Sequence, residues 1–106
     1  MKIIIDECLP KRITSFFKDD SAWTVPQLGL NGYKDTELLD ELDKRNIDIF
    51  ITIDGNIEYQ QQFTNRSFCT IIIRAVSNRF SDLKQFESTL QKAVLSSKSN
   101  TIVHIP

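Results

Sequence analysis

Short runs of β-branched residues alternate along this chain with segments in which apolar side chains recur at helical spacing. The apolar runs predict five strands, at residues 3–5, 21–25, 47–53, 68–73 and 101–105. Continuous runs of this kind are typical of strands that are covered on both faces. Amphipathic spacing predicts helices at residues 9–17, 35–45 and 83–97, and a short helix that carries Tyr59 and Phe63.

The order of these elements is β-α-β-α-β-α-β-α-β, which predicts an α/β fold with three layers. Helices should cover both faces of a mostly parallel, five-stranded sheet. Because right-handed crossovers restrict the topology, we expect the strand order 2-1-3-4-5, as in Rossmann-like folds. The chain then reverses direction between the first and third strands, and a ligand crevice should open there. We expect Trp23 and the seven phenylalanines to lie in the core.

Composition agrees with a single folded domain over residues 1–106 and narrows the range of partners. Hydrophobic residues make up 41% and charged residues 25%, which argues against an intrinsically disordered chain. The formal net charge is -1, so a nucleic acid would have to be bound by a local patch. Cys8 and Cys69 lack a zinc-binding spacing and are predicted to be small buried residues. Without a signal-like start or a long apolar run, we expect a cytoplasmic protein with no membrane partner.

Three aspartates are predicted to meet at the carboxyl edge of the sheet. Asp6 follows the first strand, Asp54 follows the third, and Asp35 begins the helix that precedes the third strand. Neighbouring parallel strands lie about 4.8 Å apart, so acids at the same level could share a cation. Carboxylate oxygens suit Mg²⁺ or Mn²⁺ better than zinc. The alternative is that these residues only form turns and cap a helix, and three acids in one crevice favour the site.

Four segments resemble a known family, and the first three occur in the same order and spacing as its motifs. Residues 5–10 (IDECLP) look like its IDExLP start, and residues 28–39 (LGLNGYKDTELL) are similar to its LGLxGxxDxEIL stretch. Residues 50–56 (FITIDGN) look like its LVTxDxD segment, and residues 71–74 (IIIR) resemble a later strand that often ends in Arg. The family is a short PIN-like group, related to the VapC-type ribonuclease toxins of bacterial toxin–antitoxin pairs. The resemblance covers nearly the whole chain.

The resemblance implies a PIN-like domain that acts as a metal-dependent endoribonuclease and as the toxin of a toxin–antitoxin pair. It assigns the metal and the catalysis to Asp6, Asp35 and Asp54, with RNA as substrate. A cognate antitoxin protein would cover the crevice, and domains of this kind often form homodimers. Larger PIN domains carry a further glutamate on an early helix, which has no clear counterpart here. Glu7 and Glu37 are candidate substitutes, and Asn56 stands where an acid is frequent.

Other residues near the motifs are candidates for supporting roles. Thr52 lies two residues before Asp54 on the same strand face, where its hydroxyl could orient a carboxylate or a water, although threonine is also simply a common strand residue. Four cations are candidates for contacts to RNA phosphates, and each could equally be an ordinary solvated charge. These four are Lys11, Arg12, Lys34 and Arg74.

Two other classes of function fit parts of the pattern. A non-catalytic PIN-like binding module would keep the fold and hold a protein partner. A receiver-like phosphoacceptor domain shares the strand order and has an acidic pair after the first strand, here Asp6 and Glu7, with an acid after the third, here Asp54. It should also carry a Lys after its fifth strand, and residues 102–106 (IVHIP) contain none. The nuclease interpretation is therefore preferred.

Overall fold

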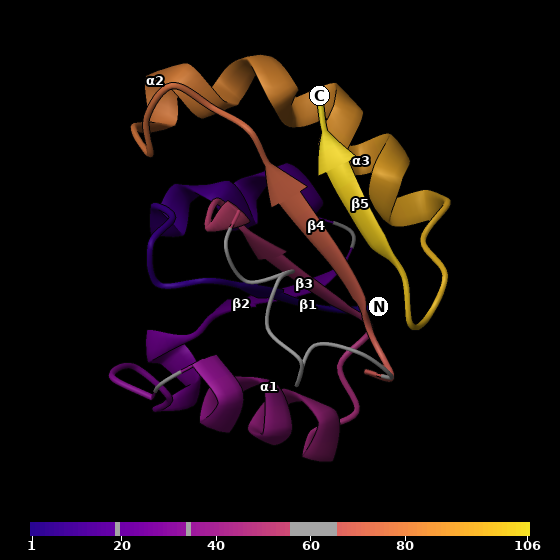
Figure 1. Ribbon diagram of the computed structural model, residues 1–106. Helices are drawn as coiled ribbons and strands as arrows, with labels where there is room; N and C mark the ends of the chain where they lie inside the picture. The colour runs from indigo at the N-terminus through magenta and orange to yellow at the C-terminus, as the bar shows by residue number, and fades with distance from the viewer. Residues whose placement is uncertain (19, 34, 56–65) are drawn as a thin grey trace.

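A computed structural model describes residues 1–18, 20–33, 35–55 and 66–106, with Asp35 described by its backbone alone. It contains a five-stranded, all-parallel sheet in the order β2-β1-β3-β4-β5 (Figure 1). The strands are β1 (Lys2–Ile5), β2 (Ser21–Thr24), β3 (Ile49–Thr52), β4 (Cys69–Ile73) and β5 (Ile102–Ile105). The predicted α/β class and strand order are thus confirmed.

The central strands are held by the burial of branched residues on both faces. Every residue of β3 and β4 is buried, as expected for parallel strands between two layers. In the register, β1 lies between β2 and β3, with Ile4 opposite both Trp23 and Phe50. Four of the predicted strands are one or two residues too long at one or both ends. The exception is β1, which begins one residue earlier than predicted.

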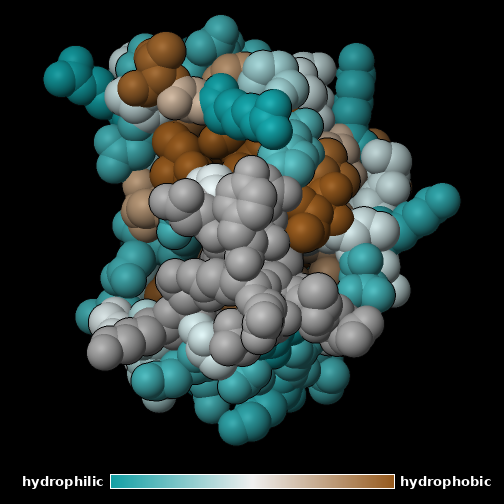
Figure 2. Space-filling view, in the orientation of Figure 1, coloured by the Kyte–Doolittle hydropathy of each residue, from teal (hydrophilic) through white to brown (hydrophobic). Residues whose placement is uncertain are grey.

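Helices cover both faces of the sheet and divide the core into two layers. The 3₁₀ helix η1 (Lys11–Phe17), α2 (Phe80–Leu83), η5 (Lys84–Phe86) and α3 (Glu87–Leu95) accompany the layer that contains Ile3, Ile5 and Ile51. The helix α1 (Asp35–Lys44) covers the opposite face, where Leu38, Leu39 and Leu42 pack with Ile4 and Phe50. Another 3₁₀ helix, η2 (Pro26–Leu28), follows β2. In Figure 2 the outer side of the α1 layer is hydrophilic.

Two of the predicted helices differ from expectation in their form. The helix predicted at residues 9–17 is a 3₁₀ helix, although Leu9, Ile13 and Phe16 are buried as its spacing indicated. The helix predicted at residues 83–97 is interrupted by η5 and ends at Leu95. No helix in the described part of the chain is long and apolar enough to cross a membrane.

The prediction that Trp23 and the seven phenylalanines lie in the core was wrong for Trp23. Its side chain is 48% exposed, because β2 is an edge strand that pairs only with β1 and is incompletely covered. Phe16, Phe17, Phe50 and Phe68 are buried, while two further phenylalanines are partly buried against the core. The predicted short helix with Tyr59 and Phe63 lies outside the described residues.

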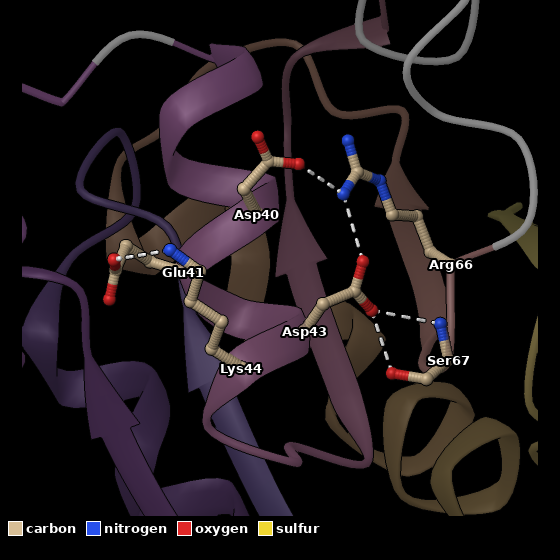
Figure 3. Close-up of polar contacts among 6 residues, drawn as sticks. All are labelled: Asp40, Glu41, Asp43, Lys44, Arg66 and Ser67. Atoms are coloured by element: carbon tan, nitrogen blue, oxygen red, sulfur yellow. Dashed lines mark hydrogen bonds and ion pairs between the residues drawn. The ribbon is translucent and has the colours of Figure 1, made fainter.

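A nearly buried arginine joins α1 to the segment that leads into β4. Arg66 is only 9% exposed, and its Nη1 donates hydrogen bonds to Asp40 at 2.7 Å and Asp43 at 2.8 Å (Figure 3). Asp43 also accepts hydrogen bonds from the backbone N–H and the hydroxyl of Ser67, at 2.9 and 2.7 Å. These contacts hold the residues just before β4 against the last two turns of α1.

Candidate functional site

The carboxyl ends of β1 and β3 form the edge of the sheet at which the candidate site lies. The backbone N–H of Asp6 donates to the carbonyl of Ile51 at 2.9 Å, so Asp6 continues the pairing of β1 with β3. A tight turn follows, in which the N–H of Leu9 donates to the carbonyl of Asp6 at 3.0 Å. Asp54 lies two residues beyond the end of β3. The two acids thus follow neighbouring strands, as the sequence predicted.

The hydroxyl of Thr52 connects these two aspartates. It donates a hydrogen bond to Oδ2 of Asp6 at 2.7 Å and accepts one from the backbone N–H of Asp54 at 3.1 Å. Thr52 is fully buried, so its rotamer is fixed by its surroundings as well as by these hydrogen bonds. The Asp6 carboxylate and the Asp54 backbone are therefore separated by one hydroxyl group, which fixes the position of one relative to the other.

Two further groups orient the Asp6 carboxylate. The backbone N–H of Glu7 donates to its Oδ1 at 2.8 Å, and the thiol of Cys8 donates to its Oδ2 at 3.4 Å. Burial raises the pKa of Asp6 above its ordinary value, although the hydrogen bonds that it accepts act in the opposite direction. Among the described residues, no Lys, Arg or His forms an ion pair with this carboxylate.

Cys8 is a member of the site that the sequence reasoning missed. It was predicted as a small buried residue, as Cys69 indeed is, but Cys8 is only partly buried and its sulfur lies 3.7 Å from the Thr52 hydroxyl. Burial, together with the nearby charge of Asp6, raises the pKa of its thiol to about 11. Cys8 therefore remains a neutral donor at physiological pH. Its place two residues after Asp6, within the turn that closes β1, was the available signal.

The structure describes only some of the other predicted site residues. The backbone of Asp35 begins α1, while its side chain, together with Lys34 and Asn56, lies outside the described residues. Arg74 directly follows β4, where its N–H donates to the carbonyl of Ile105 at 2.5 Å. Arg12 stacks its guanidinium 4.0 Å from the ring centroid of Phe80, which draws it towards the α2 layer.

The donor set matches the chemistry of a hard divalent cation but is not complete among the described side chains. Oδ1 of Asp6 accepts one hydrogen bond and keeps lone pairs for another contact, and a carboxylate buried without a cation would be stabilised by one. No group of three or more His, Cys, Asp or Glu side chains in the described part of the chain could hold a metal. The predicted participation of Asp35 falls on a side chain outside the described residues, so it stays a prediction.

The comparisons with known proteins assign no family to this chain. No protein-family model, no curated protein and no solved structure matches it. The geometry of the site and the sequence resemblance are therefore the basis for any functional proposal.

Proposed function

We propose that this protein is a metal-dependent endoribonuclease of the PIN-like type. The observation that carries the proposal is the linked pair at the carboxyl edge of the sheet. The Asp6 carboxylate is held by Thr52, whose hydroxyl also binds the backbone of Asp54. In open α/β sheets this edge is where ligands bind, next to the point at which the strand order reverses. Here that point lies between β1 and β3.

Asp6 and Asp54, with Asp35 as the third ligand, would hold Mg²⁺ or Mn²⁺. Such an ion supplies a water nucleophile of lowered pKa and stabilises negative charge on a phosphate oxygen. The chain's own contribution is orientation. Thr52, Cys8 and the N–H of Glu7 fix the carboxylate plane of Asp6, and they leave one side of Oδ1 available. Pre-oriented donors of this kind reduce the reorganisation required when substrate binds.

Cations beside the acids would hold the RNA backbone. Lys11 is exposed near the start of η1, and Arg74 is exposed directly after β4, so the two lie at the carboxyl ends of β1 and β4. Phosphate contacts position a nucleic acid without reading its sequence. With a net charge of -1 the protein lacks an excess of basic residues, so we expect weak binding with a shallow salt dependence, because few phosphates are contacted.

The resemblance also supports a cytoplasmic toxin whose partner is a cognate antitoxin, with a homodimer as the assembled form. The antitoxin would cover the acidic crevice and present a basic side chain to it. Light scattering of the purified protein, and purification of the chain together with the product of its neighbouring gene, test this part. A strict monomer with no co-purifying neighbour would contradict it.

The decisive experiment measures cleavage of single-stranded RNA with Mg²⁺ or Mn²⁺, compared with EDTA. Asp6→Asn and Asp54→Asn each remove one charge with little change of shape. Loss of a metal ligand should lower the rate on the order of hundreds-fold or more. Asp48→Asn is the matched control, because Asp48 is exposed and accepts from the Lys2 N–H at the opposite edge of the sheet. Equal cleavage in EDTA, or full activity in the Asp6 and Asp54 variants, would refute the proposal.

A non-catalytic binding module is the second candidate. The observation that favours it is that the early-helix glutamate of larger PIN domains has no clear counterpart in this sequence. Such a module would bind its partner equally well with and without metal, and its Asp6→Asn variant would bind normally. The cleavage assay and a metal titration together separate the two functions.

A further inference from the structure

A cavity lies beside the proposed acidic site, at the carboxyl ends of β1 and β2. It has a volume of about 390 Å³ and is lined by Glu7, Leu9, Lys11, Thr24, Pro26 and Gln27. Two turns build it: the one that leads from β1 into η1, and the one that leads from β2 into η2. Pockets that bind small molecules have volumes of roughly 300–1,000 Å³. The cavity is thus large enough for a nucleoside.

The cavity adjoins the acidic site through two of its lining residues, Glu7 and Leu9, whose backbone N–H groups both donate to Asp6. Glu7 is one of the lining residues and is exposed, and its backbone N–H donates to Oδ1 of Asp6 at 2.8 Å. A chain of nucleotides with one phosphate at Asp6 would therefore pass close to this cavity. Lys11, which also lines the cavity, offers a cation for a neighbouring phosphate.

The lining residues combine apolar surface with a defined set of hydrogen-bonding groups. Leu9 is buried and, with Pro26, provides apolar surface for the face of a base. The Oε1 of Gln27 accepts the N–H of Thr24 at 2.8 Å, and the Thr24 hydroxyl accepts the N–H of Gln27 at 3.2 Å. Because only the amide oxygen can accept a hydrogen bond, the Nε2 of Gln27 is left as a donor. Glu7, when ionised, is an acceptor only.

We propose that this cavity is a base-binding subsite that prefers guanine. It deepens the proposed nuclease function and rests on it for the identity of the substrate as RNA. Guanine presents two adjacent N–H donors and a carbonyl on its Watson–Crick edge. A carboxylate can accept both donors, and the Gln27 amide can donate to the carbonyl. Uracil presents a single N–H between two carbonyls, which a carboxylate repels. Bases of single-stranded RNA are commonly read on this edge.

The test is a titration of the whole protein in EDTA with guanosine 5′-monophosphate and, separately, with uridine 5′-monophosphate. Binding is measured from the changes in the protein's NMR chemical shifts. We expect the guanine nucleotide to bind on the order of tenfold more tightly, with shifts centred on Glu7, Leu9 and Gln27. Glu7→Gln should remove this preference, because an amide replaces one acceptor with a donor. Glu87→Gln, a matched change at the start of α3, should retain it. Lys11→Gln should weaken the binding of both nucleotides to the same extent. Lys92→Gln on α3 should leave the binding of both unchanged.

The outcome is separable from that of the proposed function. If the guanine nucleotide binds preferentially and RNA is not cleaved, the subsite is supported and the nuclease proposal is not. If the active protein cleaves RNA but binds both nucleotides equally, or Glu7→Gln keeps the preference, the subsite is overturned. Sequencing of cleavage products gives an independent readout, because a guanine should be enriched at one fixed position beside the cut.

Discussion

The hydroxyl groups of Thr52 and Thr70 are both buried in the sheet, yet their surroundings are opposite. The Thr52 hydroxyl donates to Asp6 and accepts from Asp54, whereas the Thr70 hydroxyl has no hydrogen-bond partner among the described residues. A buried polar group costs free energy when it is unpaired, and removal of a paired group leaves its partners unsatisfied. The same substitution should therefore have different effects at the two positions.

We predict that Thr52→Val lowers the free energy of unfolding by about 1–3 kcal/mol, because the Asp54 N–H and the Asp6 carboxylate each lose a partner. Thr70→Val is the matched control, and it should be neutral or stabilising. Urea denaturation of both variants measures the difference. Equal losses of stability would show that the Thr52 hydroxyl does not orient the site.

The raised pKa of Asp6 gives a second prediction, on pH dependence. The folded protein holds the Asp6 proton more tightly than the unfolded chain does, so the folded form binds more protons between the two pKa values. The contribution of Asp6 to stability therefore falls as the pH rises through this window, and the loss persists at neutral pH. In EDTA, Asp6→Asn should be at least as stable as the wild type at pH 7. At pH 4 any stability that the variant gains over the wild type should be small. A large loss of stability at pH 7 would contradict this.

Sequence could identify Asp6 and Asp54 because each follows a buried β-branched run, and strand ends are readable from such runs. Cys8 was different. Its thiol reaches Asp6 only because the chain turns back between Asp6 and Leu9, and a turn of this kind leaves no periodic pattern. For Thr52 the sequence allowed two interpretations, an orienting hydroxyl or a residue that is simply common in strands. Only the three-dimensional contacts distinguish an orienting hydroxyl from a residue chosen for strand propensity.

At the scale of elements, the attachment of β4 to α1 depends on the contacts of Arg66. Burial alone would raise the pKa of Asp43, but the hydrogen bonds from Arg66 and Ser67 and the guanidinium charge outweigh it, and the pKa lies below its ordinary value. A carboxylate with a lowered pKa stabilises the fold above its unfolded pKa. That stability is lost as the pH falls through the folded pKa.

We predict that Asp43→Asn lowers the free energy of unfolding at pH 7 by about 1–2 kcal/mol, since three hydrogen bonds to a charged group are weakened or lost. The variant should also lose less stability than the wild type between pH 7 and pH 3. Asp40→Asn is the control, because Asp40 is more exposed and makes one of the Arg66 contacts. If both variants were equally affected, Asp43 would not be the main anchor.

The elements themselves were mostly predictable, and the exceptions have physical reasons. Strand positions followed from apolar runs, and α1 followed from its leucine spacing. The interruption of the last helix by η5 was not predictable, because residues 80–95 contain neither Gly nor Pro. Trp23 was wrongly predicted to lie in the core, because a sequence does not reveal how completely an edge strand is covered. It lines a cavity of about 330 Å³ with Ile4 and Leu28 at the surface.

At the scale of the whole molecule, the strand order determines which residues can act together. A sheet in the order β2-β1-β3-β4-β5 brings residues 6 and 54 to one edge although 48 positions separate them in the sequence. This arrangement could be predicted from the alternation of strands and helices and from right-handed crossovers. The participation of Asp35 stays a prediction, because it depends on a side chain outside the described residues.

The last prediction follows from this grouping and concerns the stability of the entire domain. If the acids bind Mn²⁺ in the folded state only, the ion stabilises the protein by mass action, by about 2.7 kcal/mol at a hundred times its Kd. For a domain of this size that corresponds to a rise in Tm on the order of 10 °C. Asp6→Asn should abolish the rise, whereas Asp48→Asn at the opposite edge should retain it. A Tm that responds equally in the two variants would place any bound metal elsewhere, and a Tm insensitive to Mn²⁺ in the wild type would favour the non-catalytic module.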